Sequence, residues 1–259
     1  MNLPLYQVDA FTDTTFRGNP AAVCPLREWP EDQILQNIAL ENNLSETAFF
    51  VDQGDYFHLR WFTPTLEIDL CGHATLASAF VIFQYLGYDK NTIRFRTKGG
   101  ELSAVKQDDK IALNFPAWKP QPITLPPLLP EALSLTPIQT LKTRDLIALF
   151  PSEEQILSLH PNFALLEQLE PFCVIATAPG KNCDFVSRVF APKAGVPEDP
   201  VTGSAHSSLI PYWAEKLQKN ELVAFQLSKR SGVLFCRNLG ERVLIAGHCA
   251  PYLKGTITI

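Results

Sequence analysis

Apolar residues recur along the chain at spacings typical of helices in some segments and of strands in others. Residues 30–44 carry apolar side chains at positions 34, 35, 38 and 40 and acids in their first turn, which predicts a helix. Residues 74–86 are apolar on nearly every side, so we expect a helix that is enclosed by its domain and wrapped by strands. Residues 205–217 predict a third helix, which Pro211 either kinks or delays.

Shorter segments rich in β-branched and aromatic residues predict strands around these helices. The first residues of the chain have neither the basic start nor the apolar core of a secretory signal, and they predict the first strand. Ser152 and Gln155 have the spacing of a capping box at the start of a further helix, and Gly87 is placed to end the helix over 74–86. The other predicted strands are TAFFV (47–51), YFHLRWF (56–62), TIRFRT (92–97) and KIALNF (110–115).

The chain carries one pattern twice, which indicates an internal duplication. Residues 57–80 resemble residues 185–210, first at an offset of 128 and, after a three-residue insertion, at an offset of 131. Two further segments match in the same order, 19–35 with 145–157 and 97–102 with 228–234. The matched pairs are Phe57 and Phe185, Arg60 and Arg188, Phe62 and Phe190, Pro64 and Pro192, Glu67 and Glu198, Gly72 and Gly203, and Ala74 and Ala205.

Between the two copies, residues 116–137 contain seven prolines. Proline fixes φ and removes a backbone donor, so we predict an extended linker here rather than a central strand or a helix. The domain boundary is expected inside this linker, with an N-terminal domain over 1–118 and a C-terminal domain over 119–259. The last strand of the chain either stays in the C-terminal domain or crosses back to the first domain.

Composition and charge narrow the class of protein. A chain of 259 residues with a net charge of -5 suits one or two globular domains and argues against nucleic acid or an anionic membrane as the main partner. Its longest apolar run falls far short of the roughly 18 residues of a membrane span. Six widely spaced cysteines predict free thiols in a reducing cytoplasm, with neither a disulfide framework nor a metal site.

A glycine precedes each of the two predicted buried helices in the repeat, at Gly72 and Gly203. Glycine permits close backbone approach, and the first N–H groups of a helix attract anions. Two such helix starts that faced one cleft would hold a carboxylate well. A small carboxylic acid is therefore the expected substrate, although either glycine could serve packing alone.

Several motifs together resemble the PhzF-like phenazine-biosynthesis isomerase family, which belongs to the diaminopimelate epimerase superfold. They are AFTDTTFRGNPAAVC, LSETAFF, LRWFTPTLEIDLCGHATLASAF and PEDPVTGSAH, and they cover essentially the whole chain in order. The resemblance implies an α+β fold of two pseudo-symmetric domains, each a strongly curved, mostly antiparallel sheet around a central helix. It also implies a homodimer that needs no cofactor and isomerises a small carboxylic acid by moving a proton.

The resemblance assigns roles to individual residues. The glutamate of the SETAF motif, the general acid/base of the family, falls on Glu46, while the motif histidine falls on His73 and the motif aspartate on Asp199. A glutamate suits this role if burial raises its pKa. The helix dipole is expected to keep His73 neutral, which favours hydrogen bonding over metal binding. The substrate-binding positions fall on Asn19, whose role is the least defined, and on Gly72, Gly203 and Ser204.

Cys71 raises an alternative chemistry. Enzymes like diaminopimelate epimerase use two opposed cysteines, one at each helix start, and Cys71 occupies the first of these positions. The repeat places Thr202 at the second, and a threonine hydroxyl is too weak an acid to mirror a thiol. A two-thiol racemase is thus disfavoured, and Cys71 is either a remnant of that plan or a small apolar filler. Two rivals stay open: an amino- or imino-acid racemase or epimerase that uses Cys71, and a non-catalytic partner-binding protein that retains the fold.

Overall fold

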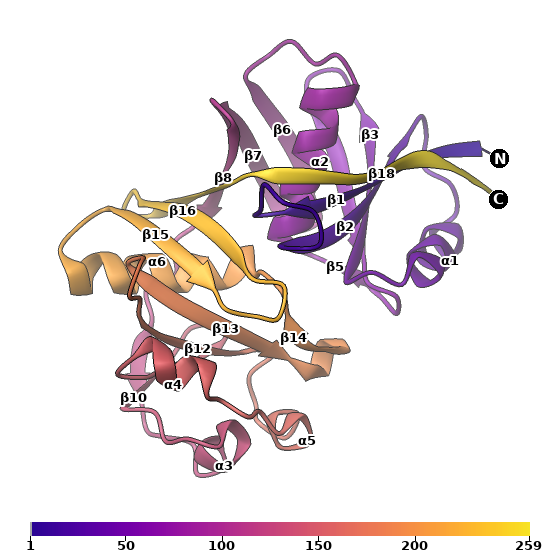
Figure 1. Cartoon of the computed structure of the whole chain (residues 1–259). Helices are drawn as coiled ribbons and strands as arrows, with labels where there is room; N and C mark the ends of the chain where they lie inside the picture. The colour runs from indigo at the N-terminus through magenta and orange to yellow at the C-terminus, as the bar shows by residue number, and fades with distance from the viewer. Residues whose placement is uncertain (1) are drawn as a thin grey trace. The chain divides into compact units, whose positions relative to one another are not determined.

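Each half of the sequence repeat builds its own sheet against one long helix (Figure 1). The computed structural model describes residues 2–259. The chain divides into a first unit, Met1–Phe115 with Ile245–Ile259, and a second unit, Pro116–Leu244. The C-terminal strand thus belongs to the unit in which the chain begins.

The first unit is a mixed, mostly antiparallel sheet. Its strands pair in the order β18, β1, β2, β3, β4, β6, β7 and β8, and β5 adds to β4. Only the pairs β2–β3 and β4–β6 are parallel in this series. The strands are β1 (Asn2–Ala10), β2 (Asn19–Leu26), β3 (Glu46–Asp52), β4 (Phe57–Phe62), β5 (Glu67–Ile68), β6 (Thr92–Thr97), β7 (Gly100–Gln107), β8 (Lys110–Pro116) and β18 (Cys249–Thr258).

Helix α2 (Gly72–Tyr85) is the enclosed helix that the sequence predicts. Most of its side chains are buried, and it packs against β1, β2, β3 and β18 (Figure 1). The amphipathic helix α1 (Asp32–Asn42) lies over another part of the sheet, where Leu35, Ile38 and Ala39 join a separate apolar cluster. The helix that is apolar on all sides, α2, is therefore in the interior, and the amphipathic helix α1 is at the surface. Both positions agree with their hydrophobic patterns.

The second unit repeats this strand order. Its strands pair as β9, β10, β11, β12, β13, β15 and β16, β14 adds to β13, and β11–β12 and β13–β15 are parallel. The elements are β9 (Gln121–Ile123), α3 (Leu129–Leu133), β10 (Gln139–Lys142), β11 (Leu146–Leu149), α4 (Glu153–Leu157), α5 (Phe163–Leu166), β12 (Val174–Pro179), β13 (Phe185–Ala191), η1 (Pro192–Ala194), β14 (Val196–Asp199), α6 (Gly203–Leu217), β15 (Glu221–Gln226), β16 (Gly232–Asn238) and β17 (Arg242–Gly247). The last residues of β17 belong to the first unit.

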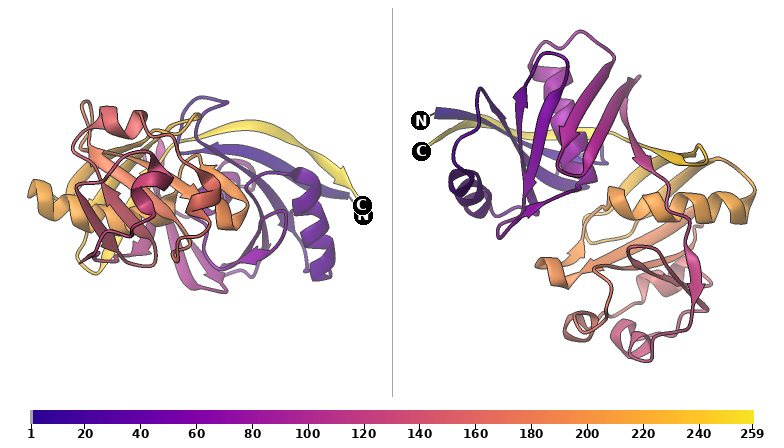
Figure 2. Two further views of the ribbon diagram at one scale, coloured as in Figure 1. Left: turned by 90° about the horizontal axis from the view of Figure 1, so that it is seen from below. Right: turned by 180° about the vertical axis from the view of Figure 1, so that it is seen from behind.

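Helix α6 is the counterpart of α2. It begins at Gly203 and continues through Pro211, so the proline neither delays nor ends it. The helix packs on β15 and β16 (Figure 2), and the Trp213 ring stacks on Phe185 with their centroids 5.6 Å apart. The α+β architecture of curved sheets around helices is confirmed.

The duplication is visible in side-chain contacts as well as in topology. Arg60 forms a bidentate ion pair with Glu67, with donor–acceptor distances of 2.8 and 3.0 Å. Arg188 forms the same pair with Glu198 at 2.8 and 2.9 Å. Each guanidinium also lies 5.1 Å from the ring centre of the phenylalanine two residues further along its strand. Three matched positions of the repeat, an arginine, a glutamate and a phenylalanine, thus make matched contacts.

The proline-rich segment is more structured than the sequence predicts. It contains the short strand β9 and the short helix α3, in which Pro130 stands in the first turn, where a missing N–H costs nothing. Leu129, Ala132 and Leu133 are fully buried in the apolar cluster of the second unit. The prediction of a bare extended linker over 116–137 is wrong here, because apolar residues between the prolines supply core contacts.

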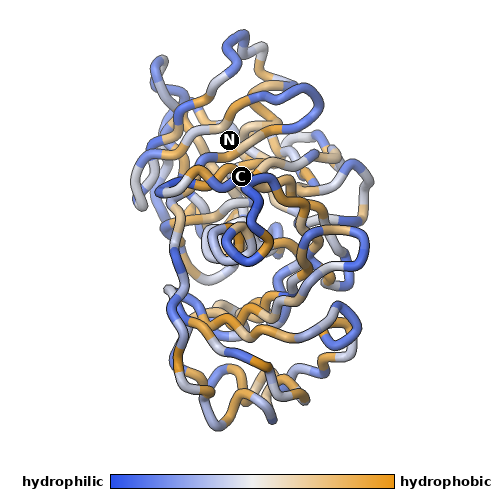
Figure 3. The backbone as a smooth tube through the Cα atoms, turned by 90° about the vertical axis from the view of Figure 1, so that its left-hand side faces the viewer, coloured by the Kyte–Doolittle hydropathy of each residue, from blue (hydrophilic) through white to orange (hydrophobic). Residues whose placement is uncertain are grey.

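Smaller predictions have mixed outcomes. Ser152 is the N-cap of α4, but its side chain makes no capping hydrogen bond. Gly87 directly follows the last turn of α2 with φ of +68°, as a helix-ending glycine does. All six cysteines are free, and within residues 2–259 no helix is long and apolar enough to cross a membrane. Hydrophobic stretches alternate with hydrophilic ones along the backbone (Figure 3).

Candidate active site

Helix α2 begins without a side-chain cap. Cys71 occupies the N-cap position with an extended backbone (φ −141°, ψ 114°), and its side chain accepts no hydrogen bond from the helix. Thr75 donates its hydroxyl hydrogen to the carbonyl oxygen of Cys71 at 2.5 Å, which ties the N-cap to the next turn. Gly72, the first helical residue, has no side chain to cover the N–H groups of this turn. Such uncapped groups suit an anion.

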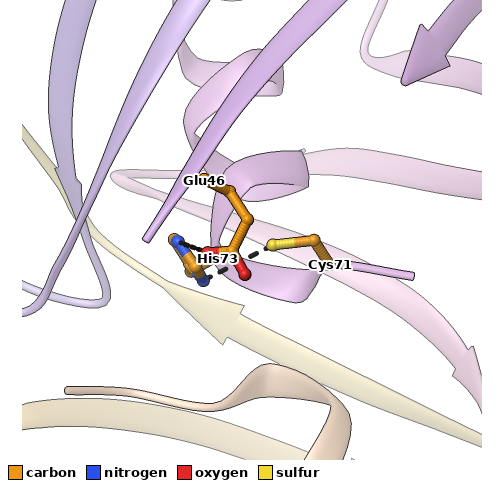
Figure 4. A group of neighbouring side chains, drawn as sticks. All are labelled: Glu46, Cys71 and His73. Carbon is orange, nitrogen blue, oxygen red and sulfur yellow. Dashed lines mark hydrogen bonds and ion pairs between the residues drawn. The ribbon is translucent and has the colours of Figure 1, made fainter. Parts of the chain in front are cut away.

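Glu46 and His73 come from different elements and meet at this helix start. Glu46 is the first residue of β3, and His73 lies in the first turn of α2. Oε2 of Glu46 lies 3.0 Å from Nε2 of His73 (Figure 4). Their side chains are 13% and 4% exposed, so the interaction between them is less screened than on the surface.

Two further side chains contact the other nitrogen of the imidazole. Nδ2 of Asn19, the first residue of β2, lies 3.1 Å from Nδ1 of His73, and Asn19 is fully buried. Sγ of Cys71 lies 3.5 Å from the same Nδ1 (Figure 4). Asn19, Glu46 and His73, which were predicted separately from three distant motifs, are therefore brought together, with Cys71 beside them.

Burial and charge set the protonation of this group. Burial raises the pKa of the Cys71 thiol to about 11, and the Glu46 carboxylate adds to the effect, so Cys71 is a thiol at neutral pH. Burial opposes an imidazolium, but the Cys71 and Glu46 side chains beside the ring outweigh it and hold the pKa of His73 well above 6.5. With Cys71 protonated, Glu46 is the partner that acts near neutral pH. Contact with Glu46, and not the helix dipole as predicted, sets the charge of His73.

The same three side chains contain the donor types that bind transition metals. One ligand atom each from Glu46, Cys71 and His73 lies within 4.8 Å of the others. However, Sγ of Cys71 contacts Nδ1 of the ring, whereas Oε2 of Glu46 contacts Nε2. A metal ion binds a single nitrogen of an imidazole, so these contacts do not form one coordination shell. The geometry fits a chain of proton-sharing contacts better.

Asp199 is fixed in the loop before α6 in the second unit. Its Oδ2 accepts a hydrogen bond of 2.5 Å from the hydroxyl of Thr202. The buried side chain of Gln226 donates to the carbonyl oxygen of Asp199 at 2.7 Å and accepts from the backbone N–H of Thr202 at 2.8 Å. One amide therefore bridges the end of β14 and the start of α6 and holds Asp199 in a defined place.

Gly203 and Ser204 form the first turn of α6, as predicted, and an arginine that the sequence did not single out lies beside them. Nη2 of Arg144 is 3.4 Å from Oγ of Ser204, and the guanidinium pairs with the buried carboxylate of Asp145 at 2.8 Å. His206, near the start of the same helix, is fully buried and shares a contact of 2.8 Å with the carbonyl oxygen of Thr202. Burial lowers the pKa of His206 to about 4, so it is neutral.

Comparison with known proteins identifies the family. The sequence model described as Phenazine biosynthesis-like protein (PhzC-PhzF) matches residues 8–255. An uncharacterized isomerase of Pseudomonas aeruginosa is 51% identical over 257 residues, which cover 99% of each chain. A crystal structure of a PhzF-family phenazine biosynthesis protein from Enterococcus faecalis superimposes with a TM-score of 0.98 at 45% identity, covering 100% of both chains.

A more distant likeness concerns the fold alone. The crystal structure of a hydroxyproline epimerase from Agrobacterium vitis gives a TM-score of 0.66 at 9% identity, over 99% of this chain and 92% of that one. The epimerase-like fold that the motifs imply is thus present. On the evidence of the family match and of the relatives aligned over their whole length, this chain belongs to the phenazine biosynthesis-like (PhzC-PhzF) family.

Proposed function

We propose that this protein is a cofactor-independent isomerase that moves a proton on a small carboxylic acid, with Glu46 as the acid/base. Three relatives that are 51%, 48% and 44% identical over essentially their whole length are named as isomerases, which supports the reaction class. Membership of the PhzC-PhzF family supports the same class.

The observation that carries the proposal is the contact of Glu46 with His73. A carboxylate that is mostly shielded from water and 3.0 Å from an imidazole has a partner that stabilises its ionised form before it accepts a proton. General acid/base catalysis needs such a positioned group. With Oε2 facing the ring, Oε1 is the oxygen left to take a proton from a carbon and return it to another.

The remaining predicted residues would bind the substrate. The uncapped start of α2 at Gly72 offers backbone N–H groups to a carboxylate. Asp199 would orient a polar group of the substrate, and Gly203 and Ser204 would offer the first turn of α6, where Arg144 adds a positive charge. A homodimeric assembly and a cytoplasmic location stay predictions.

The contact between Cys71 and His73 favours a second candidate, a racemase or epimerase that uses a thiol. An imidazole 3.5 Å from a thiol is the arrangement that activates cysteine nucleophiles. Two observations weigh against it: burial raises the pKa of Cys71 to about 11, and Thr202 stands where the second thiol would be. A non-catalytic partner-binding role would leave the burial of Glu46 beside His73 without a use.

One experiment separates these candidates. The protein is incubated in D2O with a panel of small amino, hydroxy and dienyl carboxylic acids, and deuterium incorporation is followed by proton NMR and mass spectrometry. We expect Glu46→Gln to abolish incorporation and Cys71→Ser to retain it, while Glu28→Gln, at an exposed position, serves as the control. Exchange that survives in Glu46→Gln rules out Glu46 as the base. Exchange lost only in Cys71→Ser establishes the thiol chemistry.

A further inference from the structure

Both groups that contact Nδ1 of His73 are hydrogen-bond donors. The amide nitrogen of Asn19, 3.1 Å away, can only donate, and the thiol of Cys71, 3.5 Å away, donates weakly when protonated. Nδ1 therefore acts as the acceptor, and the ring hydrogen of the singly protonated imidazole belongs on Nε2. That nitrogen faces Oε2 of Glu46 at 3.0 Å.

Asn19 and Glu46 have opposite effects on the protonation of the His73 imidazole. The carboxylate of Glu46, from β3, favours a second proton on the imidazole. A hydrogen on Nδ1 would point at the amide nitrogen of Asn19, from β2, which cannot accept it, and at the sulfur of Cys71, which is only a weak acceptor. The dipole at the start of α2 also opposes the cation.

The backbone around Asn19 positions its side chain next to Nδ1 of His73. Gly18 has φ of +63°, and a Cβ at this position would collide with the carbonyl oxygen of Ala10, so glycine is needed for the chain to turn into β2. In the parallel pair β2–β3, Ala21 is opposite Glu46, which sets Asn19 at the same end of the sheet. The GNP motif thus combines a required turn with a buried donor.

We propose that Asn19 is a positioning residue that fixes the tautomer of His73, with the single ring hydrogen on Nε2, and so keeps a transferred proton on Glu46. Its role is therefore to orient His73, in addition to or in place of binding substrate. The claim that a transferred proton stays on Glu46 rests on the proposed function of Glu46, whereas the tautomer of His73 does not.

The consequence for proton transfer follows from acid/base balance. When Glu46 takes a proton, a C–H bond of the substrate breaks and an O–H bond forms on the carboxyl group. An imidazole with a bare Nε2 would accept that proton and pass it away from the substrate. A ring that already carries hydrogen on Nε2 cannot do so. The O–H bond then breaks as a new C–H bond forms, and the net change is an isomerisation.

Nitrogen-15 NMR of the full-length protein with labelled histidine tests the tautomer directly. The His73 signals are assigned by their absence in His73→Gln. We expect wild-type His73 at the alkaline end of a titration to show a protonated Nε2 and a bare Nδ1. Asn19→Asp replaces the donor by an acceptor of the same shape and should bring the second proton onto Nδ1 at a pH about one unit or more higher than in wild type.

Two variants separate this role from a structural one. Asn19→Ala removes the donor without adding an acceptor, and it should also raise the pH at which Nδ1 becomes protonated. Cys71→Ala keeps Asn19 and should leave the Nε2 tautomer unchanged. Backbone amide spectra report whether each variant is folded. A hydrogen on Nδ1 in the singly protonated wild-type ring, or ring shifts unchanged in both Asn19 variants, would overturn the inference.

The activity readout distinguishes this inference from the function itself. In D2O, wild-type protein should return part of the abstracted proton to the product, and Asn19→Ala should lose more of it to solvent while still turning over. If Glu46→Gln keeps full exchange but the tautomer is as expected, the proposed base is wrong and the tautomer stands. If exchange needs Glu46 but the tautomer is reversed, Asn19 has another role.

Discussion

The two long helices start in the same way but carry different chemistry. Strand pairing aligns the two units residue by residue, because the matched phenylalanines of the repeat each have a partner on the neighbouring strand. Phe62 pairs with Thr47, and Phe190 pairs with Val174. The residues one position earlier, Glu46 and Cys173, are therefore counterparts. By the same registers and the repeat, the other counterparts are Asn19 and Thr143, Cys71 and Thr202, His73 and Ser204, and Thr75 and His206.

The two helix starts share a side-chain contact that stabilises the first turn. Thr75 contacts the carbonyl oxygen of Cys71 at 2.5 Å, and its counterpart His206 contacts that of Thr202 at 2.8 Å. Two different side chains thus stabilise the same backbone group in the first turn. This contact depends on position within the helix, and it is retained although the residue type changed.

What differs is the capacity to exchange a proton near neutral pH. In the first unit, a carboxylate and an imidazole lie 3.0 Å apart. In the second, the counterparts are a hydroxyl at Ser204 and a thiol at Cys173, whose pKa burial raises. At these aligned positions, acid/base groups that titrate near neutral pH are therefore present in one copy only. This asymmetry fits a single shuttle that works from one side better than two opposed bases.

The strongest test of this difference is to replace His73 in the first unit by serine, the residue at the matching position of the second unit. His73→Ser should lower the rate of deuterium exchange by about 10²- to 10⁴-fold, the range typical of losing a group that supports acid/base catalysis. The measurement is the initial exchange rate on an acid that wild-type protein processes. Ser204→Ala should lower the maximal rate by less than about tenfold, since its hydroxyl carries no acid/base role. An exchange rate in His73→Ser close to wild type would remove the imidazole from the mechanism.

The matched ion pairs allow a second comparison, this time of stability. Arg188 also donates to the carbonyl oxygens of Ile156 and Leu159 at 3.1 and 3.0 Å, whereas the additional partner of Arg60 is the exposed Asp32. Arg188→Ala should therefore cost about 3 kcal/mol of unfolding free energy, because it leaves a partly buried carboxylate and two carbonyls unpaired. Arg60→Ala should cost about 1–2 kcal/mol, since one lost partner is on the surface.

Urea unfolding of both variants measures this difference. Arg237→Ala is a suitable control, because its pair with Glu221 is on the surface and should contribute within about 0.5 kcal/mol. Equal losses for Arg60→Ala and Arg188→Ala would show that the extra carbonyl contacts of Arg188 contribute nothing.

Sequence alone predicts the parts of this molecule that repeat or that follow a strong local pattern. Phe57, Arg60 and Phe62 match their counterparts at a constant offset, so the sequence predicts the duplication, and the matched ring contacts agree with it. The all-round apolar segment before Gly87 predicts the enclosed helix. The SETAF, GNP and CGH motifs indicate that Glu46, Asn19 and His73 share a site, although they lie far apart in the chain.

Contacts that depend on the register of distant strands are beyond such prediction. Arg144 reaches Ser204 only because β11, which it precedes, lies beside β12 and begins near the start of α6, which no local pattern encodes. The helix dipole predicts a neutral His73, whereas its contacts with Cys71 and with Glu46 on another element raise its pKa. The proline-rich segment was predicted from its backbone limits alone, and the apolar side chains between its prolines gave it a buried helix.

The two buried histidines at the helix starts respond to pH in opposite directions. The pKa of His206 in the folded state is about 4, below its ordinary value of 6.5, because burial opposes the charge. Between these pH values the unfolded chain binds a proton that the folded chain refuses, so stability falls as pH falls. The pKa of His73 is raised, so its contribution is fully present below 6.5 and is lost as pH rises through the raised value.

The third expected effect is therefore a pH-dependent change in stability with opposite sign in the two units. Lowering the pH from about 7 to about 5 should reduce the unfolding free energy of wild type by on the order of 2 kcal/mol through His206, and His206→Gln should lose most of that dependence. His73→Gln should instead lose stability relative to wild type at about pH 6, and this loss should shrink as pH rises through the raised pKa of His73. Urea unfolding at these pH values measures both slopes. If His206→Gln kept the full acid slope, protonation of His206 would not be its cause, and the contrast between the two helix starts would hold for catalysis but not for stability.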